Sequence, residues 1–438
     1  MGDKMKVKAR TLPGFMELMP DKQILFNKMY DSIRKSYEKF GFVPLDTPII
    51  ESSEVLLAKA GGETEKQIYR FTKGNTDMSM RFDLTVPLAK YVAINYGQLT
   101  FPFRRYQLSK VFRGERPQKG RYREFYQCDI DIIGDGELSI LNDAEIPSVI
   151  YTTFKDLGFD KFVIHINNRK LLNGFFEYLG LKENISDILR IVDKLEKIGE
   201  EAVKECLAEL EIEENKIDEI IKFIKIDGAP LDILNKLNSL GIGKEEFNQG
   251  LDELSKVVQG VKAFGIPEDN FKIDLKIARG LDYYTGTVYE TMLTDFPGLG
   301  SVCSGGRYDN LAEYYTNKKL PGVGISIGLS RLYDYLLSEN VIKPEESSTA
   351  KAIVIPMSED INYAFNIAQK LREADINTEV CYNRKTVKSM LNYANKLKIP
   401  YAVFIGEDEI KNNVVTVKDM NEGNQQTVKI EEAINIIK

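Results

Sequence analysis

The sequence predicts an α+β chain: a large N-terminal part built on a mainly antiparallel sheet and interrupted by a helical insertion, followed by a small C-terminal α/β domain. Three observations support this prediction. Residues 101–133 have the pattern of strand, loop and strand, which indicates a long antiparallel hairpin. Residues 186–262 carry apolar side chains at helical spacing. From residue 351 onward, strand-like and helix-like segments alternate, which is typical of a mostly parallel sheet.

Length and composition fit a soluble globular protein of about two to four domains. The chain has 438 residues, of which 43% are hydrophobic and 29% are charged. It contains no apolar run long enough for a membrane span, and its charged N-terminus lacks the apolar segment of a signal peptide. We therefore expect a cytoplasmic protein without a membrane partner.

The cysteines and the single histidine exclude several kinds of chemistry. The four cysteines are far apart and form no CxxC pair, so they are expected to be free thiols, and no metal site is predicted. His165 is the only histidine, which removes Ser-His-Asp and Cys-His catalysis and His-ligated metals. We expect His165 itself to be a structural strand residue.

The N-terminal segment predicts a helix followed by an interrupted strand. Residues 21–40 carry an apolar side chain at every third or fourth position, and Gly41 is a natural C-terminal stop. The stripe consists of Leu25, Met29, Ile33, Tyr37 and Phe40. In the following "FVPLDTPIIE", Pro44 and Pro48 allow only an edge strand or an interrupted one.

The helical segment is expected to be an insertion, because strand-like sequence resumes at 273–290. It is acidic: residues 186–262 hold 18 Asp and Glu against 11 Lys and Arg, a net charge of −7. The whole chain also has a net charge of −7, so the rest of the chain is balanced overall. We predict a catalytic domain at 1–337, interrupted by the insertion at 170–265. A linker at 338–350 then leads to the α/β domain at 351–438.

The predicted hairpin is strongly basic and rich in aromatic residues. Residues 101–123 hold eight Lys and Arg and one acid. On a strand, Arg113 and Glu115 would point to one face, and Phe125 would follow on the returning strand. Such a face suits a nucleotide, because a guanidinium binds phosphate and a ring stacks on a base. The alternative is a solvated hairpin with surface ion pairs.

Two further sets of polar residues have strand spacing. Asp83 and Thr85 would share one strand face and could hold an ammonium group. Gln127, Asp129 and Asp131 would share another, and two acids within a strand are unusual. Ordinary edge or surface strands are the alternative in both cases. Glycines in "SVCSGGRYDNL" and "GVGISIGLSRL" suggest the close approach of a ligand or of another backbone.

Together these segments resemble the class II aminoacyl-tRNA synthetases and, within that class, the histidyl-tRNA synthetase family. "FRGERPQKGRYREF" is similar to class motif 2, "GVGISIGLSRL" to motif 3, and "FGFVPLDTPIIE" to motif 1. "ARGLDYYTGTVYE" and "SGGRYDNL" resemble the two signatures of the histidine enzyme. The resemblance covers nearly the whole chain. One departure is Met16-Glu17, where many relatives have an Arg-Asp pair at the dimer interface.

The resemblance implies roles for particular residues. The catalytic residues would be Arg279 and Arg113. Histidine would contact Asp83, Thr85, Gln127, Asp131, Tyr283, Tyr284 and Tyr308. ATP would contact Arg113, Glu115, Tyr122, Phe125, Arg279 and Arg331, with Mg²⁺ on its phosphates. The tRNA would contact Arg116, Gln118, Arg121, Arg384 and Lys385.

The function implied is ligation of L-histidine to tRNA(His) by a homodimer, with Pro48 at the dimer interface. Activation would need no general base, because the histidine carboxylate is already ionised at pH 7. The alternative from a different class is a non-catalytic histidine-binding regulatory subunit of ATP phosphoribosyltransferase. Such paralogues commonly lack the C-terminal domain and the ATP-binding arginines, and both features are present here. A class II synthetase for another amino acid would lack the "RGLDYY" signature.

Overall fold

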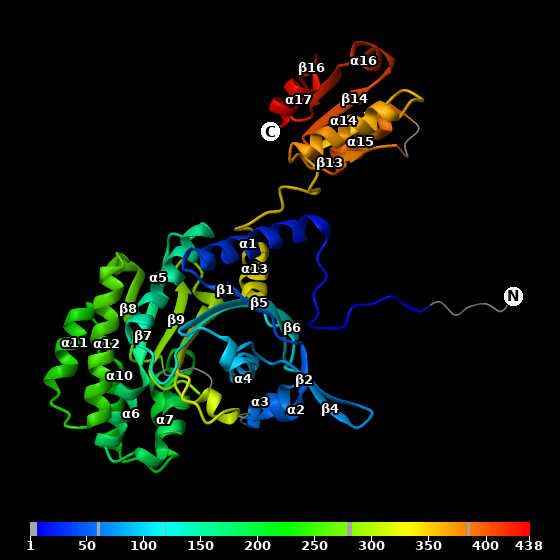
Figure 1. The fold of residues 1–438 in the computed structure, drawn as a ribbon. Coiled ribbons are helices and arrows are strands. Elements are labelled where there is room, and N and C mark those ends of the chain that lie inside the picture. Colours follow the sequence, from blue (N-terminus) through cyan, green and yellow to red (C-terminus); the bar gives the residue numbers. More distant parts are fainter. Residues whose placement is uncertain (1–6, 59–61, 119, 278–282, 383–385) are drawn as a thin grey trace. The chain divides into compact units, whose positions relative to one another are not determined.

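The computed structural model describes residues 7–58, 62–118, 120–277, 283–382 and 386–438 (Figure 1). Contacts along the chain separate it into two compact units. The first comprises Met1–Met16 and Tyr30–Ser338, and the second comprises Glu17–Met29 and Glu339–Lys438. None of the helices in the described ranges is both long and apolar enough to cross a bilayer.

An eight-stranded sheet forms the centre of the first unit, in the order β1-β5-β6-β11-β10-β9-β7-β8. Only the outermost pairs, β1 with β5 and β7 with β8, are parallel. This arrangement confirms the predicted mainly antiparallel sheet. The strands are β1 (Val43–Pro44), β5 (Phe103–Phe112), β6 (Glu124–Ile133), β7 (Phe162–Asn168), β8 (Phe271–Ile273), β9 (Thr287–Leu293), β10 (Ser301–Tyr308) and β11 (Gly322–Ile327). A smaller sheet, β2-β4-β3, contains β2 (Ile50–Ser52), β3 (Arg70–Lys73) and β4 (Thr76–Met80).

The α-helices between Pro20 and Ser338 that lie outside residues 169–263 are α1 (Pro20–Lys39), α2 (Ser53–Leu57), α3 (Gly62–Gln67), α4 (Thr85–Asn95), α5 (Leu141–Asp156) and α13 (Leu329–Ser338). Of these, α5 and α13 contact the eight-stranded sheet, and α2 contacts the smaller sheet. The N-terminal α1 contacts β6. The predicted N-terminal helix matches α1 within one residue at each end. Its buried Tyr37 donates a hydrogen bond of 2.9 Å to the carbonyl of Cys128 on β6. This contact ties the helix to the strand that carries the polar face of interest.

Residues 169–263 fold as a run of helices beside β7 and β8 (Figure 1). They are α6 (Arg169–Tyr178), α7 (Ile185–Val192), α8 (Leu195–Ile198), α9 (Glu200–Ala208), α10 (Glu214–Ile224), α11 (Pro230–Ser239) and α12 (Glu245–Ala263). The backbones of α6 and α12 touch directly. A Cβ at Gly174 would lie 2.3 Å from the Phe247 nitrogen, and one at Gly250 would lie 2.3 Å from the Leu171 nitrogen. Glycine at both positions lets the two helices pack this closely.

The second unit contains a five-stranded sheet in the order β13-β12-β14-β15-β16. Its elements are β12 (Ala352–Pro356), α14 (Asn362–Glu373), β13 (Thr378–Val380), α15 (Val387–Lys396), β14 (Tyr401–Ile405), α16 (Glu407–Asn412), β15 (Val415–Asp419), β16 (Gln425–Val428) and α17 (Ile430–Ile437). The predicted α/β alternation is confirmed. The three predicted strands β12, β13 and β14 pair in parallel as expected. The whole sheet is nevertheless mixed, because β15 pairs antiparallel with β14 and forms an antiparallel hairpin with β16, whose turn contains Gly423 at φ +79°.

Candidate functional site

Two adjoining cavities open in the first unit around β6, β10 and β11. The first has a volume of about 400 Å³ and is lined mainly by carboxyl and tyrosine side chains. The second has a volume of about 350 Å³ and is lined by arginines and by aromatic and small residues. They share the lining residues Arg113, Gln127, Ser301, Ser304, Ser326 and Arg331. A ligand in one cavity would therefore meet a ligand in the other beside two guanidinium groups.

Three predicted tyrosines form an aromatic wall of the first cavity. The rings of Tyr283 and Tyr284 lie 4.9 Å apart, and those of Tyr283 and Tyr308 lie 5.8 Å apart, both edge to face. Tyr283 and Tyr308 are almost fully buried. Edge-to-face packing fixes the ring positions, so the phenol hydroxyls have defined directions. The pocket is suited to a flat polar ring.

Asp131 lies in the first cavity, where Oδ1 is hydrogen-bonded and Oδ2 has an ion pair but no hydrogen bond. Oδ1 accepts a hydrogen bond of 2.6 Å from the Tyr308 hydroxyl, and Oδ2 lies 2.6 Å from Nη2 of the buried Arg105. Burial raises the pKa of Asp131 to about 6, against the attraction of Arg105. Gly324 pairs with Asp131 across the strands, and a Cβ there would lie 2.2 Å from Oδ1. The glycine is therefore needed to accommodate the carboxylate.

Asp83 and Thr85 also line the first cavity, but not from a strand as predicted. Strand β4 ends at Met80, and Thr85 is the first residue of α4. The Oδ1 atom of Asp83 accepts hydrogen bonds from the backbone nitrogens of Thr85 (3.1 Å) and Val86 (2.9 Å). An aspartate that satisfies the free N–H groups at a helix start favours a helix over a strand here.

Arg113 lies between the cavities and is held on several sides. Its guanidinium lies 4.4 Å from the centroid of the Phe82 ring and 5.2 Å from that of the Phe125 ring. Its Nε donates a hydrogen bond of 3.3 Å to the Phe82 carbonyl. The predicted hairpin is present, but β5 ends at Phe112, so Arg113 and Glu115 do not alternate on a strand. Both nevertheless line the second cavity.

The other predicted nucleotide contacts gather in the second cavity. Tyr122 and Phe125 come from the hairpin, and Arg331 comes from the first turn of α13. An Nη2–H of Arg331 is directed at the Leu299 carbonyl. Burial, followed by a hydrogen bond with Asp334, raises the pKa of Tyr122. Glu115 is the one carboxylate in this cavity among the described residues, and it pairs with Arg121 at 3.5 Å.

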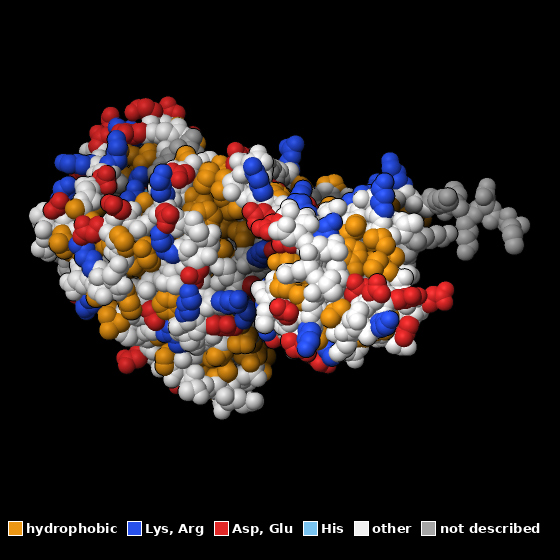
Figure 2. All heavy atoms as spheres, turned by 90° about the horizontal axis from the view of Figure 1, so that it is seen from above, with side chains coloured by type: hydrophobic (Ala, Val, Ile, Leu, Met, Phe, Trp, Pro, Cys, Tyr) orange, Lys and Arg blue, Asp and Glu red, His pale blue; other side chains and the backbone are white. Residues whose placement is uncertain are grey.

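The turn between β5 and β6 presents exposed polar side chains. Arg116, Gln118 and Arg121 are exposed, and Gln118 and Arg121 form a short antiparallel bridge. On the face shown in Figure 2, basic and acidic side chains are interspersed, and no large area of that face is covered by basic side chains alone. Three predicted site residues, Arg279, Arg384 and Lys385, lie outside the described residues.

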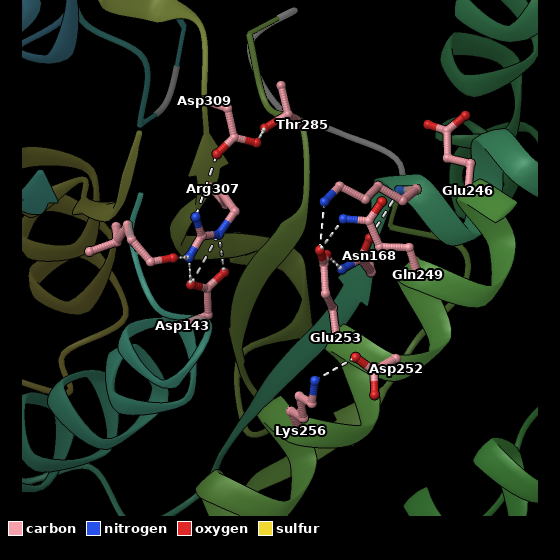
Figure 3. Close-up of polar contacts among 12 residues, drawn as sticks. Asp143, Asn168, Glu246, Gln249, Asp252, Glu253, Lys256, Thr285, Arg307 and Asp309 are labelled. Atoms are coloured by element: carbon pink, nitrogen blue, oxygen red, sulfur yellow. Dashed lines mark hydrogen bonds and ion pairs between the residues drawn. The ribbon is translucent and has the colours of Figure 1, made fainter. Parts of the chain in front are cut away.

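A buried ion pair that the sequence did not predict supports the base of the site. Arg307 on β10 donates to both oxygens of Asp143, from Nε (3.0 Å) and Nη2 (2.6 Å), and Nη1 reaches Asp309 at 3.5 Å (Figure 3). Asp309 in turn accepts from the Thr285 hydroxyl at 2.5 Å. Thr285 follows Tyr284 directly, so this chain of contacts anchors the tyrosine wall. A charged residue within the glycine-rich "SGGRYDNL" was the available signal.

A second polar cluster connects the helical run to the same region. Glu253 on α12 accepts hydrogen bonds from Asn168 (2.8 Å) and Lys170 (2.5 Å) at the start of α6 (Figure 3). The backbone nitrogen of the adjacent Arg169 donates to the Gly286 carbonyl at 2.9 Å. His165, expected to be structural, is buried on β7 with Nδ1 2.7 Å from Oδ2 of Asp274. These contacts fix the positions of Asp274 and Gly286.

The mainly antiparallel sheet of the first unit and the separate α/β domain that follows it are the fold of a class II aminoacyl-tRNA synthetase. Two family models match the chain: one described as histidyl-tRNA synthetase at residues 14–332, and one described as an anticodon binding domain at residues 351–438. The chain belongs to the histidyl-tRNA synthetase family.

Individual relatives agree over the full length of the chain. It is 60% identical over 433 residues to a protein named histidine--tRNA ligase from Clostridium tetani, covering 99% of this chain and 98% of that one. It is 46% identical over 432 residues to a protein of the same name from Finegoldia magna, covering 99% and 100%. The solved structure of the histidyl-tRNA synthetase from Nostoc sp. PCC 7120 matches with a TM-score of 0.91 and 41% identity, covering 99% of each chain.

Proposed function

We propose that the chain ligates L-histidine to tRNA(His) in two steps, forming histidyl-adenylate from ATP and then transferring histidine to the terminal ribose hydroxyl of the tRNA. One observation carries the proposal beyond family membership: a cavity lined by carboxyl and tyrosine side chains, which suits histidine, adjoins a cavity lined by arginines and aromatic residues, which suits a nucleotide. Arg113 and Arg331 line both. Two reactants bound there would meet without further movement, which supplies much of the rate enhancement in such reactions.

In the first step, a carboxylate oxygen of histidine attacks the α-phosphorus of ATP. A new P–O bond forms, the bond to the β-phosphate oxygen breaks, and pyrophosphate leaves. The crowded negative charge needs fixed positive charge in place beforehand. Arg113, held by Phe82 and Phe125, supplies a guanidinium that does not have to reorganise. We assign a second such role to Arg279.

Recognition of the side chain is assigned to Asp131 and the three tyrosines of the first cavity, with Asp83, Thr85 and Gln127 at the amino group. These are buried hydrogen-bonding groups in a pocket shaped for a ring. An apolar analogue would leave them without partners, and sites of this kind reject such analogues by about 10⁴- to 10⁵-fold. Adenine is assigned to the space between Phe125 and Arg331, beside Tyr122 and Glu115.

Magnesium would arrive with ATP as part of the substrate. Among the described residues, Glu115 is the one carboxylate of the second cavity, which fits an ion held mainly by phosphate oxygens and water. When bound, the ion would neutralise charge on the β- and γ-phosphates. The α-phosphate would be positioned by protein side chains, Arg113 and Arg279.

The tRNA is proposed to meet two parts of the chain. Its acceptor end would reach Arg116, Gln118 and Arg121, which are exposed beside the nucleotide cavity. The anticodon would meet the domain at 351–438, with Arg384 and Lys385 as contacts. We further propose the catalytic domain at 1–337 with its insertion at 170–265, the linker at 338–350, and a homodimer working in the cytoplasm.

The test is amino-acid-dependent exchange of pyrophosphate into ATP, measured with each of the twenty amino acids, followed by aminoacylation of tRNA(His). Exchange with histidine alone, and charging of tRNA(His), are expected. Histidine binding without exchange would favour the regulatory-subunit alternative and overturn the proposal. Exchange with a different amino acid would assign the chain to another substrate.

A further inference from the structure

Four buried carboxyl groups line the first cavity: Asp83, Asp129, Asp131 and Glu290. The three aspartates differ in how their charge is balanced. Asp131 lies 2.6 Å from the guanidinium of Arg105. Asp83 caps α4 and is attracted by Arg113, which lines the same cavity. Asp129, which is only 2% exposed, has no ion-pair partner among the described residues. A buried carboxylate without a cation is costly, so this position requires an explanation.

Asp129 has one oxygen that is unpartnered within the cavity. It lies on β6, opposite Ser326 of β11, and accepts a hydrogen bond from the Ser326 hydroxyl. Its Oδ1 is buried and has no hydrogen-bond partner. The Ser326 oxygen also accepts from the Gln127 amide nitrogen at 2.8 Å, which leaves Oε1 of Gln127 buried and unpartnered as well. Two acceptor atoms on neighbouring positions of one strand face thus lack a donor.

The pKa of Asp129 in the first cavity agrees with the missing ion-pair partner. Burial raises the pKa of Asp129 to about 7, against the attraction of Arg105 and with the repulsion of Asp131. A bound cation would provide the charge that this carboxylate lacks.

We propose that Asp129 is a further substrate-binding residue that accepts a hydrogen bond from the α-ammonium group of the amino acid, together with Oε1 of Gln127. The inference rests on the proposed function, since it deepens the assignment of the same cavity. Asp83, Thr85 and Gln127 were already predicted to contact the amino group. Asp129 adds a carboxylate oxygen without a hydrogen-bond partner, whose negative charge complements the positive charge of the ligand.

The ammonium group is favoured over the imidazole ring by position along β6. Gln127 lines both cavities, so it marks the junction where the histidine carboxylate must meet ATP. The ammonium group is attached to the carbon next to that carboxylate. Asp129 is two residues further along the same strand face, at about 6.6 Å. The ring would extend beyond it toward Asp131 and Tyr308, whose contact already engages one oxygen of Asp131.

The test compares two ligands and two variants by isothermal titration of the full chain. L-histidine is compared with imidazole-4-propionate, which keeps the ring and the carboxylate but lacks the ammonium group. Asp129→Asn keeps the side-chain shape and removes the charge. Asp252→Asn is the matched control, because Asp252 is exposed on α12, pairs with Lys256 at 2.6 Å (Figure 3) and lines neither cavity.

Asp129→Asn is expected to weaken L-histidine binding roughly 10- to 100-fold and to leave imidazole-4-propionate binding within about twofold. The KM for ATP should not change, and Asp252→Asn should behave as wild type. Equal losses for both ligands, or no loss for either, would overturn the inference. Wild-type histidine binding with an unchanged Asp129→Asn affinity overturns it while the proposed function stands. A wild-type chain that neither binds histidine nor supports exchange overturns both. If Asp129→Asn does not fold, Asp129→Ser takes its place under the same criteria.

Discussion

The first unit contains two buried clusters that each combine an arginine with aspartate side chains. They differ in how many of their polar atoms have hydrogen-bond partners. In the cluster of Arg307 and Asp143, both aspartate oxygens accept hydrogen bonds, and Arg307 also donates to two backbone carbonyls. In the cluster of Asp129, Asp131 and Arg105, Oδ1 of Asp129, Oδ2 of Asp131 and two guanidinium nitrogens of Arg105 have no hydrogen-bond partner. The first cluster is fully hydrogen-bonded at its aspartate, whereas the second has unpartnered carboxylate oxygens on two residues that line a cavity.

The number of unpartnered polar atoms distinguishes a cluster that stabilises the fold from one that can bind a ligand. Buried polar groups in native proteins are nearly always satisfied, so a group of unsatisfied atoms at a cavity marks where a ligand completes the hydrogen bonding. The Arg307 cluster fixes the position of the tyrosine wall through Asp309 and Thr285. We propose that the Asp129 cluster binds the amino acid.

The largest effect is expected from breaking the closed cluster. Arg307→Met leaves the fully buried Asp143 carboxylate without a cation and should lower the free energy of unfolding by about 3–5 kcal/mol. Urea denaturation followed by circular dichroism measures it. Replacing both partners, as Arg307→Met with Asp143→Leu, should recover much of the loss. A single variant as stable as wild type would show that the cluster is not a scaffold.

The next effect concerns Arg113, at the junction of the two cavities. Arg113→Gln keeps a polar side chain of similar length but removes the fixed charge at the α-phosphate. Removing one preorganised group of this kind typically lowers kcat by about 10²- to 10³-fold. Histidine-dependent pyrophosphate exchange measures the rate, and circular dichroism confirms folding. A folded variant within threefold of wild-type kcat would contradict the assigned role.

The Asp129 cluster should make the free energy of unfolding depend on pH. With the pKa of Asp129 raised to about 7 by burial, the folded chain keeps a proton that the unfolded chain releases near pH 4. Stability from this group is therefore present at low pH and is lost as pH rises to 7. Between pH 5.5 and 8, wild type should lose about 2 kcal/mol more than Asp129→Asn. Denaturation at both pH values without histidine provides the measurement, and parallel curves would contradict it.

The smallest effect is expected at the exposed turn. Arg116→Gln should raise the KM for tRNA(His) a few-fold, more at low than at high salt, because one phosphate contact is lost. Pyrophosphate exchange, which needs no tRNA, should be unchanged. Lys256→Gln on α12 is the charge-matched control. A change in exchange, or an equal change in the control, would remove Arg116 from the tRNA contact surface.

The sequence predicted elements whose determinants are local and failed where distant partners decide. The apolar stripe of α1 and the pattern of the β5–β6 hairpin are contained in consecutive residues. Asp83 and Thr85 are a local exception: their spacing fits a strand, but Asp83 accepts hydrogen bonds from the first backbone N–H groups of α4 instead. The pairing of Arg307 with Asp143 joins residues 164 positions apart, which no local pattern can reveal.

The free oxygen of Asp129 was equally out of reach of sequence reasoning. The strand spacing placed Asp129 on one face with Gln127 and Asp131. Only the structure shows that Arg105 pairs with Asp131 and that Ser326 engages one oxygen of Asp129. The number of hydrogen bonds that a buried group makes depends on which strands flank it. Here the flanking strands are β5 and β11, and β11 lies almost two hundred residues away along the chain.

The most direct test is a crystal structure of the chain with a non-hydrolysable analogue of histidyl-adenylate. The account predicts adenine between Phe125 and Arg331, the phosphate mimic beside Arg113, and the ammonium nitrogen within about 3.2 Å of Oδ1 of Asp129. An analogue bound elsewhere, or one whose ammonium group points away from β6 while Asp129 remains unpartnered, would contradict it.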